Sequence, residues 1–171
     1  MTARYFVDAN VFVYARDARD ARKQALAAKW IARLWTEDSG RTSMQVLSEY
    51  YSVVTRKLRL RVSSDKAWDD VQQLLGWRPH AVDEEILRHA REIEQRYGLS
   101  WWDSMIVAAA QLQDCDVLLT EDLQDGMRFG PLTVRNPFTM VIEEPGAEYA
   151  LTRSAAVHRP RGRPRRPAAR A

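Results

Sequence analysis

Four acidic residues in separate parts of the chain are the side chains best suited to chemistry: Asp8, Glu49, Asp103 and Asp122. Carboxylates that share one cleft repel each other unless protons or a cation intervene. The chain has one cysteine and three histidines, with no clustering at metal-ligand spacing. Ligation by oxygen atoms alone points to Mg²⁺ or Mn²⁺ rather than to zinc. Such a metal activates water and stabilises charge on a phosphodiester during hydrolysis.

Each of these acids also has an ordinary structural explanation when it is taken alone. Asp8 stands between a predicted strand and a predicted helix, where aspartate is a favoured cap. Asp103 follows Ser100 by three residues, which is capping-box spacing. Asp122 lies in turn-forming sequence, and Glu49 lies on a predicted helix, where charged side chains are usually solvated. The chemical interpretation therefore depends on where the four residues lie relative to one another.

The hydrophobic pattern predicts short strands that alternate with helices. Strands are expected at 4–8, 117–119 and 132–134, and 41–59 begins with a candidate very short strand before it continues as a helix. The other predicted helices cover 10–16, 20–37, 65–76, 83–97 and 100–113. In the helix over 65–76, Ser64 is the expected N-cap and Gly76 the expected terminator. This alternation predicts an α/β fold whose central, mostly parallel sheet is covered by helices.

The predicted topology brings most of the acids to one edge of the sheet. Asp8 and Asp122 lie at or just beyond the carboxyl ends of predicted parallel strands, where open α/β sheets bind ligands. Asp103, in the first turn of an apolar helix, can point to the same edge. Glu49 lies outside the apolar stripe of its helix, at the border between the core and a cleft. Its assignment is the least supported by this reasoning.

Other residues near the acids are expected to be structural or solvent-exposed. Tyr51 and Trp102 are expected in the core, although aromatic residues beside the acids could also stack on bases. Glu121 is expected to be exposed, and Asp125 reads either as a further acid near the metal or as part of a turn. The single cysteine, Cys115, is expected to be a small buried hydrophobic residue.

Four segments of the chain resemble the PIN-domain nucleases, and among them the VapC-type toxins of toxin–antitoxin pairs. The resemblance implies a PIN-like three-layer fold, with Asp8, Glu49, Asp103 and Asp122 as the metal-binding catalytic acids. It gives Asn10 and Thr120 the role of orienting ligands or water, although Asn10 also fits a helix N-cap. The matching segments are FVDANVFVYA (6–15), TSMQVLSEYYSVVTRKL (42–58), LSWWDSMIVAAA (99–110) and VLLTEDLQDG (117–126).

The same resemblance implies an endoribonuclease that cleaves RNA with Mg²⁺ or Mn²⁺. Members of the family are typically homodimers, and a cognate antitoxin protein neutralises each by burying a segment in the active-site groove. A housekeeping PIN nuclease that processes RNA is the alternative within enzymes. A non-catalytic module that binds nucleic acid through a basic tail is the alternative outside them. A short antitoxin-like reading frame directly upstream would favour the toxin.

Charge is distributed unevenly along the 171 residues, whose net charge is +3. Of the 26 Lys and Arg residues, seven follow Glu148, whereas none of the 23 Asp and Glu residues does, so residues 1–152 carry a net charge of −4. We therefore expect a nuclease domain over 1–150 and a disordered, Arg- and Pro-rich tail over 151–171. The candidate nucleic-acid-binding residues of this tail are Arg159, Arg161, Arg163, Arg165 and Arg166.

The tail run PRGRPRR (160–166) is similar to an AT-hook, which binds the minor groove of A·T-rich DNA. A generic solvated polybasic extension is favoured over a true hook, because short Arg/Pro runs arise easily. Capture of RNA is a third interpretation, since an acidic body lacks its own phosphate contacts. One thiol and the lack of a signal-peptide core or membrane-spanning stretch favour a cytoplasmic protein.

Overall fold

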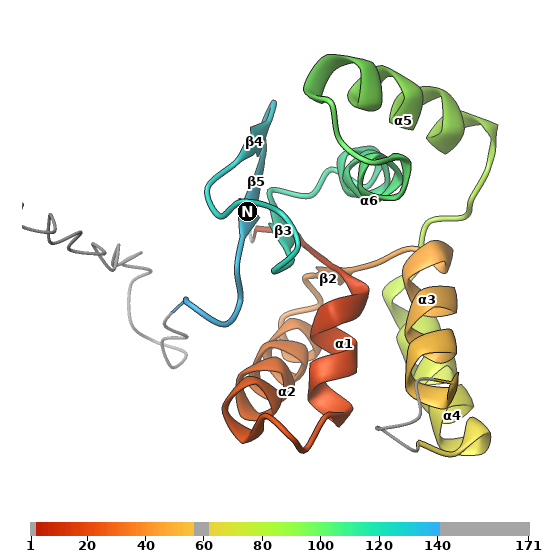
Figure 1. Cartoon of the computed structure of the whole chain (residues 1–171), viewed down its shortest axis with the longest axis vertical. Helices are drawn as coiled ribbons and strands as arrows, with labels where there is room; N and C mark the ends of the chain where they lie inside the picture. Colours follow the sequence, from red (N-terminus) through yellow and green to blue (C-terminus); the bar gives the residue numbers. More distant parts are fainter. Residues whose placement is uncertain (1–2, 57–61, 141–171) are drawn as a thin grey trace, which may run out of the picture.

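The computed structural model describes residues 3–56 and 62–140, which form a five-stranded sheet flanked by helices (Figure 1). The order of the strands in the sheet is β2-β1-β3-β5-β4. The first four are parallel, and β4 pairs antiparallel with β5. The strands are β1 (Tyr5–Val7), β2 (Gly40–Arg41), β3 (Val117–Leu119), β4 (Arg128–Phe129) and β5 (Leu132–Arg135).

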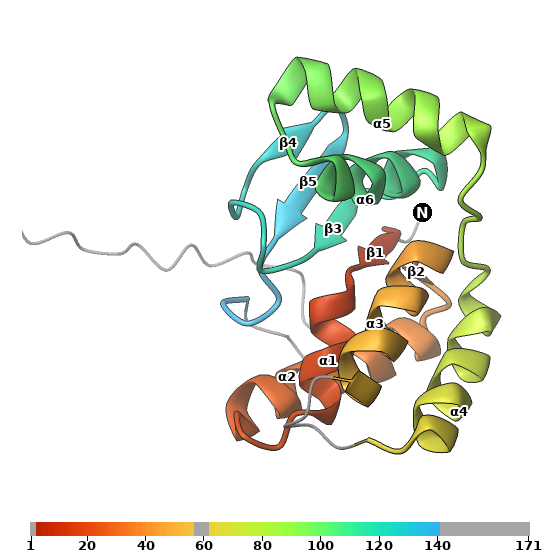
Figure 2. The same ribbon diagram turned by 45° about the vertical axis from the view of Figure 1, so that its right-hand side comes forward.

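The helices form two groups on either side of the molecule. In Figures 1 and 2, α5 and α6 lie together on one side, and α1 to α4 gather on the other. The α-helices are α1 (Ala9–Arg16), α2 (Ala21–Thr36), α3 (Met44–Arg56), α4 (Ser64–Leu74), α5 (Glu84–Tyr97) and α6 (Trp101–Leu112), and a 3₁₀ turn, η1, covers Leu75–Trp77. The predicted α/β class with a mostly parallel sheet is confirmed.

The core lies between the sheet and these helices. All three residues of β1 are buried, as are Leu118 and Leu119 of β3. Helix α6 is buried on every face from Ser104 to Ala110, because α5 packs over it and the sheet lies beneath. The first and last turns of α6 are partly exposed. The predicted burial of Cys115 is confirmed, and burial raises the pKa of its thiol to about 12.

The connections of β1 and β3 run to opposite sides of the sheet, so the carboxyl ends of these two strands form a topological switch point. From β1 the chain runs through α1 and α2 to β2 on one side, whereas from β3 it runs to β4 and β5 on the other. Such a switch point is where open α/β sheets bind ligands, because no connection covers it. The register pairs Val7 with Leu119, so Asp8 and Thr120 leave the sheet side by side.

Three local expectations differ from the structure. Helix α4 begins one residue early, because Ser63 rather than Ser64 caps it by accepting a hydrogen bond from the Lys66 amide. Gly76 does not terminate this helix. It lies within η1, and the left-handed residue that ends the turn is Arg78. Strand β4 was not predicted, because it is two residues long and exists only by pairing with β5.

No helix within residues 3–56 and 62–140 is long and apolar enough to cross a membrane. The predictions for the basic tail, including its five candidate arginines, fall outside the described residues.

Candidate active site

Asp8 is the most deeply buried of the four predicted acids, with 8% of its surface exposed. It caps α1, and its Oδ1 accepts a hydrogen bond of 2.7 Å from the amide of Ala9. Its Oδ2 accepts one of 2.7 Å from the Thr120 hydroxyl and one of 3.3 Å from the Asn10 amide group. Asp8 is therefore the N-cap of α1, as one interpretation predicts. Capping uses only Oδ1, so the two donors that contact Oδ2 indicate a further role for this carboxylate.

Burial raises the pKa of Asp8 to about 6. The hydrogen bonds from Thr120 and the Ala9 amide oppose this rise, and the negative charges of Asp122 and Glu49 add to it. A carboxyl group whose pKa is raised by burial and by neighbouring negative charges is typical of functional sites. It also means that a cation at this position would offset a free-energy cost that is already present.

Asn10 joins the two acids that follow β1 and β3. Its amide nitrogen lies 3.3 Å from Asp8 Oδ2, 2.9 Å from Thr120 Oγ1 and 3.0 Å from Asp122 Oδ2. Its carbonyl oxygen Oδ1 is buried and has no hydrogen-bond partner. Asn10 is therefore not the N-cap of α1. It is a bridge between two carboxylates, with an unsatisfied acceptor beside them.

Asp122 is held in this arrangement by the turn that follows β3. Its backbone amide donates to Thr120 Oγ1 at 3.1 Å, so the hydroxyl of Thr120 accepts from the loop while it donates to Asp8. The side chain of Asp122 is exposed, in contrast to that of Asp8. The Asn10 amide nitrogen thus contacts the buried carboxylate of Asp8 and the exposed carboxylate of Asp122.

Glu49 lies on the exposed side of α3, and its charge is close enough to raise the pKa of Asp8. Asp103 lies in the first turn of α6, where Ser100 Oγ donates to its Oδ2 at 2.7 Å and accepts from its amide at 3.1 Å. Ser100 is therefore the N-cap that the capping-box spacing predicts, but Asp103 returns its hydrogen bond to the Ser100 hydroxyl rather than to the backbone amide. The structure therefore places Asp103 on the surface-facing turn of α6, with one oxygen engaged by its own cap.

A hydrogen bond joins helices α3 and α6 at their amino-terminal turns. Gln45 Nε2 donates to the backbone carbonyl of Trp102 at 3.3 Å. Gln45 and Glu49 are four residues apart on α3 and share a face of that helix. The face of α3 that carries Glu49 is thus the face directed at the turn that carries Asp103.

Hydrogen bonds from Asn10 join Asp8 and Asp122, and the charge of Glu49 acts on Asp8, whereas the contacts of Asp103 are with its own cap, Ser100. Within the two described stretches, no three His, Cys, Asp or Glu side chains come close enough to share one metal ion. Mg²⁺ typically uses only one or two protein carboxylates and keeps several waters. Asp8 and Asp122, whose Oδ2 atoms both contact the Asn10 amide nitrogen, offer two carboxylates that fit this requirement.

Sequence reasoning missed a cluster beside Asp122. Glu121 was expected to be exposed, but its side chain is only 21% exposed and pairs with Lys23 Nζ at 2.5 Å. Lys23 also donates to Tyr14 OH at 3.1 Å and lies 4.2 Å from the centre of that ring. Tyr14 stands one helical turn after Asn10, a spacing that would have placed both on one face of α1. Nothing in the local sequence indicated Lys23.

The expectation for Trp102 was wrong, because 66% of its surface is exposed. Tyr51 is half-buried against the core, as expected. Tyr50 is fully buried, and its hydroxyl donates to Asp70 Oδ2 at 2.6 Å. Of the aromatic residues near the acids, Tyr50 is therefore unavailable to a ligand and Trp102 is fully available.

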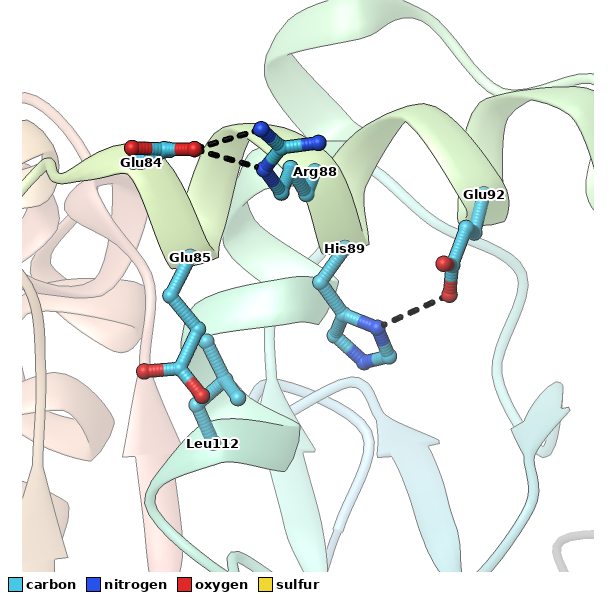
Figure 3. Close-up of a pocket in the computed structure, with 6 residues that line it drawn as sticks. All are labelled: Glu84, Glu85, Arg88, His89, Glu92 and Leu112. Carbon is cyan, nitrogen blue, oxygen red and sulfur yellow. Dashed lines mark hydrogen bonds and ion pairs between the residues drawn. The ribbon is translucent and has the colours of Figure 1, made fainter.

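A separate surface pocket on α5 does not belong to the acid cluster. Figure 3 shows Glu84 paired with Arg88, and His89 directed at Glu92, above Leu112. Leu112 ends α6, whereas Asp103 lies in its first turn. The length of the helix, about 1.5 Å per residue, therefore separates this pocket from the candidate site.

Comparison with known proteins identifies the fold and the family of the chain. No curated protein sequence matches the chain. The crystal structure of VapC20 from Mycobacterium tuberculosis, described as a toxin that cleaves the sarcin–ricin loop, is similar in fold, with a TM-score of 0.53 and 22% sequence identity. The match covers 69% of this chain and 89% of VapC20. The PIN domain family model matches residues 5–124, which span β1, β3 and all four acids, and the chain therefore belongs to the PIN-domain family.

Proposed function

We propose that this protein is a metal-dependent endoribonuclease that hydrolyses RNA phosphodiester bonds. The observation that carries the proposal is the arrangement of Asp8, Asn10, Thr120 and Asp122 at the switch point between β1 and β3. Membership of the PIN-domain family and a fold shared with an RNA-cleaving toxin support the same conclusion. Glu49 and Asp103 complete the proposed set of catalytic acids.

The residues fit a divalent cation bound through oxygen atoms, and Asp8 and Asp122 would hold it. Bound there, Mg²⁺ or Mn²⁺ supplies Lewis-acid stabilisation of phosphate charge and lowers the pKa of water. Asp8 must lose its proton to act as a ligand. Thr120 and Asn10 orient its Oδ2, and Asn10 fixes Asp122 opposite, so both carboxylates are positioned before RNA arrives.

The remaining two acids would act from the rim of the site. Glu49 and Asp103 approach from α3 and α6, whose first turns are joined through Gln45 and Trp102. Ser100 donates to one oxygen of Asp103 and leaves the other oxygen available. In this position the two acids can accept protons or hydrogen bonds from water and from the ribose–phosphate backbone.

Within this proposal, the protein is the toxin of a toxin–antitoxin pair and acts in the cytoplasm as a homodimer. Its partners are the RNA substrate and a cognate antitoxin. The tail arginines Arg159, Arg161, Arg163, Arg165 and Arg166 would supply phosphate contacts, because residues 1–152 are net negative. Deletion after Ala150 should then weaken RNA binding and flatten its salt dependence.

Sequencing of RNA ends after brief induction of the protein tests activity and target together. We expect new ends at defined sites and growth arrest, both absent with Asp8→Ala and Asp103→Ala. Asp114→Asn is the matched control, because that side chain is 89% exposed and asparagine tolerates its positive φ. Cleavage or arrest that persists in both alanine variants would refute the proposal. A short upstream reading frame that restores growth would identify the antitoxin.

A further inference from the structure

Trp102 is the most exposed large hydrophobic residue in the described part of the chain. It belongs to a helix in which the seven residues after Asp103, 104–110, are all buried. The indole emerges because it lies in the first turn of α6, directly before Asp103. We propose that Trp102 is a stacking platform that holds an unpaired RNA base beside the candidate acids, an inference that rests on the proposed function.

The backbone beneath the indole is fixed from two directions. Gln45 of α3 donates to the Trp102 carbonyl at 3.3 Å, and the Ser100 cap fixes the start of the helix. Met44, next to Gln45, is 43% exposed and adds a second apolar side chain at the same helix junction. Because this backbone is already fixed, stacking on Trp102 does not require a loop to become ordered, and the entropic cost of binding is lower.

The charge of the surroundings favours a base over a phosphate at this position. Asp103 is the adjacent residue, Glu49 lies on the facing side of α3, and residues 1–152 carry a net charge of −4. Phosphate groups are repelled by such a surface in the absence of a cation. Stacking on an indole needs no positive charge and tolerates any base, because every base has a π-face. Because the proposed function brings an RNA strand to Asp8 and Asp122, an unpaired base is the part of that strand that this surface fits.

The test uses fluorescence anisotropy to measure the binding of two fluorescein-labelled oligonucleotides, each about 12 nucleotides long, to the full chain. One is oligo(A) RNA, and the other has the same ribose–phosphate backbone without bases. EDTA prevents cleavage, and elevated salt weakens phosphate contacts, including those from the tail. We expect Trp102→Ala to weaken oligo(A) binding on the order of tenfold and to leave abasic binding unchanged. Trp102→Phe should retain most of the affinity.

Trp68→Ala is the matched control, since Trp68 is 53% exposed but lies on α4, edge-on to Tyr51. It should change neither affinity. Equal losses on both oligonucleotides would overturn the proposal, because they would indicate a disturbed helix start rather than lost stacking. Unchanged binding of both would also overturn it and would leave the indole to a protein partner. Because binding is measured without catalysis, a chain that binds through Trp102 yet cleaves nothing would refute only the proposed function.

Discussion

Thr120 donates its hydroxyl hydrogen to Asp8 Oδ2 at 2.7 Å, although the two residues lie 112 positions apart in the chain. The same oxygen of Thr120 accepts from Asn10 and from the Asp122 amide. One hydroxyl thus links the end of β1, the first turn of α1 and the turn after β3. These hydrogen bonds hold side chains from the ends of two parallel strands together in one candidate site.

Replacement of Thr120 by valine keeps the shape of the side chain and removes these hydrogen bonds. We expect RNA cleavage to fall about 10- to 100-fold, because Asp8 and Asp122 lose a shared support. The free energy of unfolding should fall by about 1–2 kcal/mol in chemical denaturation. Thr120→Ser, which restores the hydroxyl, should recover most of the activity. Full activity in Thr120→Val would show that the hydroxyl does not position the acids.

Asp8→Asn should stabilise the metal-free protein at neutral pH. Because the pKa of Asp8 in the folded state, about 6, lies above the ordinary value of 3.8, the folded state favours the protonated acid. The stability this gives the wild type is fully present below pH 3.8 and is lost as pH rises to about 6. Chemical denaturation should therefore show a gain of about 1–3 kcal/mol for the variant at pH 7.5 and little difference at pH 3.5.

The protonation state of Asp8 should also control metal binding. Mn²⁺ should raise the melting temperature of the wild type at pH 7.5, and by much less at pH 5, because the ligand must be ionised. Asp8→Asn should show little response at either pH. A pH-independent Mn²⁺ effect that survives in the variant would place the metal elsewhere.

The Lys23–Glu121 pair should stabilise the turn that carries Asp122. The two side chains are 25% and 21% exposed, so water screens the pair only in part. A double-mutant cycle of Lys23→Met and Glu121→Gln should give a coupling energy of about 1 kcal/mol. The Glu84–Arg88 pair, at 77% and 76% exposure, is the matched control and should give about 0.3–0.5 kcal/mol. Equal coupling in the two cycles would mean that partial burial adds nothing.

Tyr50 should matter for stability and not for RNA. Its hydroxyl donates to Asp70, which also pairs with Arg16, and the pKa of Asp70 is lowered although burial opposes the shift. Tyr50→Phe should reduce the free energy of unfolding by about 1–3 kcal/mol. The cleavage rate per folded molecule should not change. A normal melting curve with impaired cleavage would contradict this assignment.

Much of the fold was accessible from the sequence because its elements carry local signals. The buried run before Asp8 and the cap residues Asp83 and Ser100 predict elements that the structure contains. Strand β4 carries no such signal, since two residues become a strand only through their pairing with β5. Ser63 and Ser64 are equivalent as sequence, and tertiary packing decides which one caps α4.

The site was predictable only in part for a similar reason. Strand ends placed Asp8 and Asp122 at one edge, but the hydrogen bonds of Asn10 to both depend on side-chain directions. The exposure of Trp102 was misjudged because helical spacing does not show where a buried helix emerges from its domain. The ion pair of Glu121 required a lysine from α2, far along the chain, and no pattern marks such a partner.

Cleavage of RNA by the purified chain, measured with Mg²⁺ and with EDTA, tests the central claim most directly. The variants are Asp8→Asn and Asp122→Asn, which keep side-chain size, with Asp114→Asn as the control. We predict endonucleolytic cleavage that requires Mg²⁺ or Mn²⁺. Its rate should fall by about 100-fold or more in Asp8→Asn and in Asp122→Asn and should persist in Asp114→Asn. Cleavage that continues in EDTA, or at the wild-type rate in both variants, would contradict the account.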